Sequence, residues 1–126
     1  MPLKSDLPPH EAQALARKRL VQTCHDMLDG RLTFLEGTIM ICSLRFDLGI
    51  QERDPDIIVF VGIDSQTDYL PPDHTHHLWD SNALKRLQPE FERGEAWARE
   101  YGTPACENLI RRFSQETGES AGNSIS

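Results

Sequence analysis

The sequence lacks any long apolar run. No stretch approaches the roughly 18 consecutive apolar residues that a membrane-spanning helix requires. The first residues, MPLKSDLPPHEAQ, also lack the apolar centre of a secretory signal peptide. We therefore expect a cytoplasmic protein that does not enter membranes. Its 126 residues suit one domain with one modest core.

Cysteine is scarce, with three residues at widely separated positions, Cys24, Cys42 and Cys106. An odd number with no close pair argues against a disulfide framework and against a zinc knot. Each cysteine lies among apolar neighbours in a segment of helical periodicity. Because free cysteine is usually buried, we expect three buried thiols.

Motifs of common catalytic centres are absent. There is no GxSxG nucleophile turn and no glycine-rich phosphate loop. The stretch GIDSQTD resembles the start of a calcium loop, but the glycine and glutamate that such a loop needs are replaced by Tyr69 and Thr75. We expect no cofactor. We expect Ser65 and Thr67 to have structural roles, because such side chains hydrogen-bond local backbone amides.

Positive charge is almost absent from residues 47 to 80. The chain has a net charge of -7, and this segment holds eight acids against one base, Arg53. The rest of the chain is neutral, with 12 acids and 12 bases. Such a field repels nucleic acid and attracts a cation or a basic protein. The alternative is a solvated face that only keeps the protein soluble.

Helical periodicity is the main signal that the sequence does contain. Residues 8 to 28 carry apolar side chains at steps of three or four residues, which is the period of one helix face. Asp6 and the prolines suit the start of this helix, and Gly30 suits its end. The stripe consists of Ala12, Ala16, Leu20, Cys24 and Met27.

A second helix is predicted from Thr33 to Gly49. Thr33 and Glu36 have the spacing of a capping box. Arg45 and Asp47 lie within this helix and are predicted to be structural, because a buried arginine needs a carboxylate or carbonyl partner. Little polar face remains, so the helix is expected at the centre, with inward side chains at Phe34, Leu35, Ile39, Ile41, Cys42, Phe46 and Leu48.

The segment 57 to 63 is β-branched and suits either a buried strand or a helix. No second strand is evident to pair with it, and an isolated strand leaves its backbone groups unbonded. Asp54 followed by Pro55 is a good helix start. We therefore predict a helix here and an all-α fold, a compact bundle of four to six helices, with a strand at 57 to 63 as the alternative.

The later part of the chain is predicted as a loop over residues 64 to 80 that allows one short turn, and then as three helices. Asp80 or Ser81 caps the first of these, which ends at Pro89. Gly102 closes the second, and Thr103 with Pro104 opens the third. Residues 1 to 116 are predicted as a single domain. Residues 117 to 126 are predicted to be a disordered tail, since they carry almost no apolar side chain.

The stretch DHTHH concentrates four potential metal ligands, Asp73, His74, His76 and His77. Imidazole and carboxylate suit zinc and other transition metals. A short run cannot usually surround an ion alone, so no metal is the main prediction. The alternative is a small metal-dependent enzyme that also uses Asp64.

Three stretches together resemble a small uncharacterised bacterial family described only as a domain of unknown function. They are FLEGTIMICSLRFDLG, DPDIIVFVGIDSQTDYLP and LWDSNALKRLQPEFERGEAWAREYGTPACENLIRRF, and the resemblance covers about residues 27 to 113. The most family-like element is I-D-S-x-T-D-x-L-P, here Ile63 to Pro71, followed by Trp79. A second is AWAREYGTPAC. The family pattern has glutamate where this chain has Gln66, does not include HTHH, and implies no activity.

The charge distribution favours a non-enzymatic binding protein. Small acidic proteins of this kind are similar in size and charge to immunity proteins, which inhibit bacterial toxins. We expect the acidic segment to cover a basic toxin surface. A homo-oligomer in which residues 57 to 63 pack against a copy is an alternative. Trp79 could instead anchor its loop to the bundle. The predicted partner contacts are Asp64, Asp68, Tyr69, Asp73 and Trp79.

Overall fold

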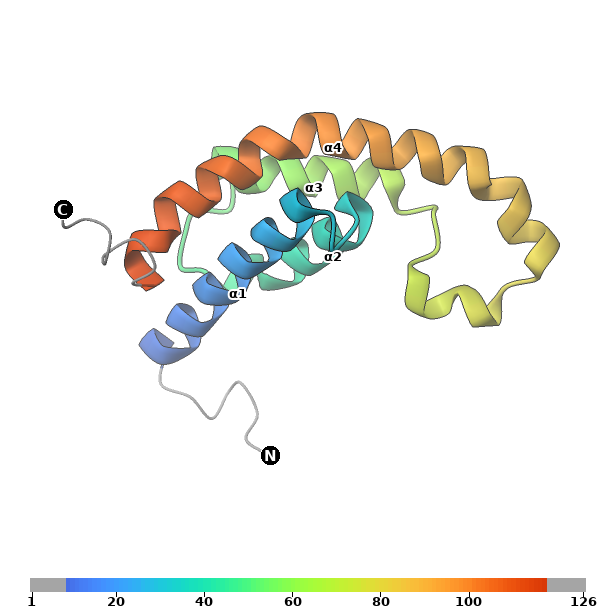
Figure 1. Ribbon diagram of the computed structural model, residues 1–126. Helices are drawn as coiled ribbons and strands as arrows, with labels where there is room; N and C mark the ends of the chain where they lie inside the picture. Colours follow the sequence, from blue (N-terminus) through green and yellow to red (C-terminus); the bar gives the residue numbers. More distant parts are fainter. Residues whose placement is uncertain (1–8, 118–126) are drawn as a thin grey trace.

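The computed structural model describes residues 9 to 117, which form helices and contain no strand. In chain order the elements are α1 (Pro9–Asp29), α2 (Phe34–Leu44), the 3-10 helix η2 (Arg45–Asp47), α3 (Pro55–Thr67), the 3-10 helix η3 (Asp73–Leu78) and α4 (Ser81–Thr117). Helix α4 packs against α1, α2 and α3. Figure 1 shows α4 as a long curved helix that follows α3 and then continues past it on the side of η3. The predicted all-α bundle is confirmed.

The core is built from one face of each long helix. The predicted stripe of α1 is confirmed from Ala16 onward, since only Ala12 stays partly exposed. Helix α2 is less enclosed than expected: Ile39 lies at the surface, and Phe46, in η2, is 69% exposed. The helix ends at Leu44, so the tighter turn of η2 rotates Phe46 away from the core. The largest fully buried side chains include Phe34, Phe60, Leu20, Met27 and Ile41.

Helix α3 begins as the sequence predicts. The Asp54 carboxylate accepts hydrogen bonds from the amides of Asp56 (3.0 Å) and Ile57 (3.3 Å), and Pro55 fills the first turn. Within the apolar run, Ile57, Phe60 and Ile63 are buried against the rest of the chain. The face proposed for packing against a second copy is thus largely covered by the protein itself.

The predicted loop over residues 64 to 80 is wrong at its start, where residues 64 to 67 form the last turn of α3. Residues 73 to 78 form the 3-10 helix η3, which corresponds to the one short turn that the prediction allowed. Helix continues to Thr67 because no breaker occurs before Pro71 and Pro72. Only the residues between these two helices and the short link to α4 are irregular.

The three helices predicted after residue 80 are one continuous helix, α4, with Pro89 and Pro104 inside it. Both prolines are exposed, so the carbonyl that each leaves unbonded can be hydrated. The helical apolar spacing continues through both prolines, and the packing of that face outweighs their cost. The start of the helix was predicted correctly, since Asp80 caps the amides of Asn82 (3.1 Å) and Ala83 (3.2 Å).

Gly102 is a packing residue and not the helix terminator that the sequence suggested. It is buried inside α4, where a Cβ atom would lie 2.9 Å from Cδ2 of Phe34 and 3.2 Å from Cε1 of Phe60. The missing side chain lets the backbone of α4 approach two buried rings from α2 and α3.

The domain and tail boundaries extend beyond the described range. The predicted tail, residues 117 to 126, lies outside the described residues except for Thr117, which ends α4. The same holds for the first eight residues of the predicted domain.

Replacing Gly102 with alanine should destabilise the protein, because the new methyl group must displace two buried rings. Overpacking of this kind costs about 1–3 kcal/mol, which exceeds the gain of about 1 kcal/mol in helix propensity. Gly62→Ala is the matched control, since nothing lies within 4 Å of its Cβ position in α3. Chemical denaturation should show opposite signs: a lower free energy of unfolding for Gly102→Ala and a higher one for Gly62→Ala. Equal gains in both variants would contradict the close approach.

Candidate functional site

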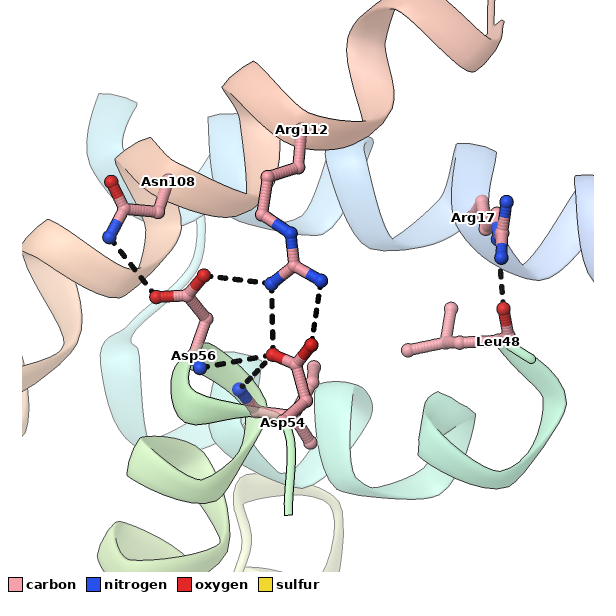
Figure 2. Close-up of polar contacts among 7 residues, drawn as sticks. Arg17, Leu48, Asp54, Asp56, Asn108 and Arg112 are labelled. Atoms are coloured by element: carbon pink, nitrogen blue, oxygen red, sulfur yellow. Dashed lines mark hydrogen bonds and ion pairs between the residues drawn. The ribbon is translucent and has the colours of Figure 1, made fainter. Parts of the chain in front are cut away.

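An ion-pair cluster fixes α3 against the C-terminal half of α4 (Figure 2). The guanidinium of Arg112 donates to Asp54 from Nη2 to Oδ2 (2.6 Å) and from Nη1 to Oδ1 (2.9 Å). Nη1 also donates to Oδ2 of Asp56 (2.8 Å), whose other oxygen accepts from the Asn108 side chain (3.1 Å). A fork-to-carboxylate pair of this kind sets orientation as well as distance.

The same cluster shifts the pKa values of Asp54 and Arg112. The bond from Arg112 holds the pKa of Asp54 below its usual value, assisted by the capped amides of Asp56 and Ile57. Reciprocally, the bond to Asp54 raises the pKa of Arg112. Asp54 is buried and Asp56 is half-buried. These two acids of the acidic segment therefore hold the fold together and are not displayed to a partner.

The other end of α3 borders a groove of about 770 Å³. Its walls come from the start of α2, the last turn of α3, the η3 segment and the part of α4 between Gln88 and Arg99. The apolar side chains that line it include Leu35, Ile39, Leu70, Pro71, Phe91 and Ala96. Six carboxylates also line it, with one arginine against them: Glu36, Asp64, Asp68, Asp73, Glu92 and Glu95, opposed by Arg99. The groove thus combines an apolar lining with a large excess of acidic side chains.

Two of these carboxylates build the groove. Glu95 of α4 accepts hydrogen bonds from the first free amides of α2, at Phe34 (2.8 Å) and Leu35 (3.0 Å), and also pairs with Arg99 (3.3 Å). Glu36 accepts from the amide of Asp73 (2.8 Å). The predicted capping box is therefore half formed: Thr33 accepts from the amide of Glu36, but the Glu36 side chain reaches η3 instead.

Asp64 and Asp68, unlike Glu95 and Glu36, take no part in holding the groove together. The described residues offer neither carboxylate a hydrogen bond or an ion pair, although both line the groove. They are spaced i, i+4 at the C-terminal end of α3, whose last turn holds no basic residue. Like charges at that spacing repel, and the negative end of the helix dipole disfavours both. The site thus carries negative charge that the fold itself does not compensate.

Asp73 and the histidines do not form a metal centre in the described part of the chain. Within residues 9 to 117, no three His, Cys, Asp or Glu side chains lie together as ligands. His76 packs on the Phe91 ring, with 5.5 Å between centroids, and its Nε2 lies 2.9 Å from the Pro71 carbonyl. The alternative set of Asp73, His74, His76 and His77 is therefore not assembled as ligands, and His76 acts as a wall of the groove.

The two aromatic residues predicted to contact a partner, Tyr69 and Trp79, are not among the residues that line the groove. Tyr69 is 55% exposed, and its hydroxyl donates to Glu90 of α4 (3.0 Å), a bond that raises the Tyr69 pKa. Trp79 is 43% exposed, so more than half of its surface is covered. The alternative in which Trp79 anchors its loop to the bundle therefore stays a prediction.

Two of the four residues predicted to be structural, Arg45 and Thr67, make local contacts. Arg45 is half-buried, and its guanidinium lies 4.3 Å from the centre of the exposed Phe46 ring, a cation–π contact. Asp47 is half-buried in η2. Ser65 is exposed on α3, and Thr67 donates to the carbonyl of Ile63 (2.8 Å) and so back-bonds within the helix.

The thiols offer no activated nucleophile. Cys24 and Cys106 are buried as predicted, and the pKa of Cys24 is raised by its bond with Cys106 and by burial. Cys42 is half-buried between α2 and α3, and burial together with the Asp64 charge raises its pKa to about 11. A thiol of such pKa is protonated at neutral pH and hence unreactive.

Sequence reasoning found three of the six groove carboxylates, Asp64, Asp68 and Asp73, because they belong to the acidic segment. It missed Glu36, Glu92 and Glu95, which come from α2 and α4. Glu36 was noticed only as a helix cap. No local pattern links Glu95 to the start of α2, since the hydrogen bonds join residues 60 and 61 positions apart.

Comparison of the chain with protein-family models, with curated proteins and with solved structures finds no match. The resemblance to a bacterial family of unknown function thus stays a prediction. Among the described helices, none is long and apolar enough to cross a membrane.

Asp54→Asn should destabilise the protein at neutral pH by about 1–3 kcal/mol, because asparagine keeps the helix cap but loses the charged bonds to Arg112. The folded-state pKa of Asp54 lies below its unfolded value of about 3.9, so its contribution is present above that value and disappears as the pH falls through the folded pKa. Urea unfolding between neutral and acid pH should therefore show wild type and variant converging below pH about 4. Asp80→Asn, which makes the same change at a cap without arginine, should change stability by only a few tenths of a kcal/mol. A difference that persists unchanged in acid would contradict the ion-pair assignment.

Asp64→Asn/Asp68→Asn should stabilise the protein by about 1 kcal/mol at low ionic strength, because it removes two repelling charges from the end of α3. The gain should shrink at high salt, which screens these charges. The control Glu100→Gln/Glu107→Gln makes the same change in net charge at exposed positions of α4 outside the groove. Denaturation at two salt concentrations measures both variants. Destabilisation by the first variant would mean that Asp64 and Asp68 are compensated within the fold.

Proposed function

We propose that this protein is a non-enzymatic binding module that covers a basic surface of a partner protein. The proposed role is that of an immunity-type inhibitor, acting in the bacterial cytoplasm against a toxin. One observation carries the proposal: Asp64 and Asp68 lie on an open groove with no hydrogen bond or ion pair from the described residues. Charges placed against the local helix dipole are costly, and such local conflicts are typical of functional sites.

The acids around the groove support a partner of opposite charge. Lysine or arginine side chains next to Asp64 and Asp68 relieve both the repulsion between them and their conflict with the helix dipole. A field of this sign also speeds the encounter with a basic protein and discriminates against acidic ones. The binding free energy of the partner therefore includes the removal of a strain that the free protein carries.

Two exposed aromatic side chains, Tyr69 and Trp79, supply candidate apolar contacts for a partner. Tyr69 donates a hydrogen bond to Glu90 and is 55% exposed, and Trp79 follows η3 and is 43% exposed. Aromatic residues are enriched among the residues that dominate interface energetics. In the proposed complex Tyr69 and Trp79 lie at the edge of the contact, and Asp64, Asp68 and Asp73 lie nearer its centre.

The decisive experiment is growth rescue. The genes on either side of the one for this chain are searched for a basic protein, and such a candidate partner is expressed alone and together with this chain. We expect co-expression to restore growth. Asp64→Lys/Asp68→Lys/Asp73→Lys should abolish rescue and lower the affinity of the purified pair at least 100-fold, because attraction becomes repulsion at three positions.

The control for that variant is Glu52→Lys/Glu100→Lys/Glu107→Lys, which changes net charge equally at exposed positions away from the groove. It should keep full rescue. Circular dichroism verifies that both variants fold. Rescue by the groove variant, or equal loss in both, would exclude the groove acids as the partner site.

A further inference from the structure

The groove has an apolar floor that charge attraction alone does not require. This floor consists of the apolar side chains that line the groove: Leu35 and Ile39 of α2, Phe91 and Ala96 of α4, and Leu70 and Pro71 of the chain before η3. A purely electrostatic contact is made on a flat, solvated face. A concave surface of about 770 Å³ with apolar lining instead has the size of sites that enclose inserted groups.

The two acids without a partner, Asp64 and Asp68, both come from the end of α3. Asp64 and Asp68 stand one helical turn apart on α3, so their charges follow the axis of that helix. Glu95 and Glu36 are already bonded to backbone amides of α2 and η3. An occupant with an apolar face for the floor and basic side chains one turn apart for α3 meets both requirements.

We infer that the occupant of this groove is an amphipathic basic helix of the partner, with its apolar face on Leu35, Ile39 and Phe91 and two basic side chains against Asp64 and Asp68. This inference rests on the proposed function and specifies the part of the partner that is bound. A peptide that binds by adding a strand is disfavoured, because residues 9 to 117 contain no strand for it to pair with. A helix satisfies its own backbone groups and presents residues at i and i+4 on one face.

The probe is a synthetic amphipathic helix with leucines on one face and lysines on the other. Two matched peptides separate the contributions: one replaces the leucines with glutamine at constant charge, and one replaces the lysines with glutamate. We expect the lysine–leucine peptide to bind at least tenfold more tightly than either, and to gain helical circular dichroism on binding. Fluorescence anisotropy of labelled peptide measures the affinities.

A variant of the groove floor tests the location. Ala96→Trp fills the groove from an exposed position of α4 and alters no carboxylate. It should weaken binding of the lysine–leucine peptide at least tenfold. The control Ala14→Trp adds the same ring at an exposed position of α1 outside the groove and should leave the affinity unchanged. Thermal denaturation verifies that both variants are folded.

Each contrary result overturns the inference. Equal binding of the lysine–leucine and lysine–glutamine peptides, or no effect of Ala96→Trp, means that only charge is recognised. Absence of binding, or binding without helix formation, excludes a helical occupant. These failures are distinct from a failure of the proposed function: an Ala96→Trp variant that still rescues growth, beside a lysine-substituted groove variant that does not, leaves the inhibitor proposal standing.

Discussion

The bidentate contact between Arg112 and Asp54 determines where α3 lies along α4, and the shape of the site follows from it. Because the start of α3 is fixed near the C-terminal end of α4, the thirteen residues of α3 end beneath the middle of the longer helix. The N-terminal part of α4 then extends past α3, which Figure 1 shows clearly. The groove is lined by residues of that extension, of η3, of the last turn of α3 and of the start of α2. An ion pair at one end of α3 thus helps to position the groove at its other end.

Local signals in the sequence predicted the elements that local chemistry decides. The stripe from Ala16 to Met27 and the cap at Asp54 depend on neighbours within a turn or two, and the structure confirms both. The same local rules wrongly predicted that the helix is interrupted at Pro89 and Pro104. Whether the helix continues is decided by the packing of α4 on three other helices. Gly102 was misread for a related reason: its role depends on Phe34 and Phe60, which no window around residue 102 contains.

The acidic segment shows what sequence reasoning can and cannot resolve about a site. Its eight acids look equivalent along the chain, yet the fold divides them. Asp54 and Asp56 are paired with Arg112, whereas Asp64 and Asp68 remain uncompensated. The fold neutralises charge where it builds structure and leaves charge unsatisfied beside an open surface. The density of charge along a segment therefore does not show which of its acids are neutralised within the fold, whereas the pairing pattern in the structure does.

The packing of α1 on the last part of α4 also constrains how the protein folds. Met27 contacts Cys106, 79 positions away, and the Arg17 guanidinium lies 5.1 Å from the centre of the Phe113 ring. Helix α1 is therefore covered fully only when the last part of α4 packs on it. Closing such a long loop carries an entropic cost before any contact compensates it. Until that loop closes, part of the apolar stripe of α1 stays exposed.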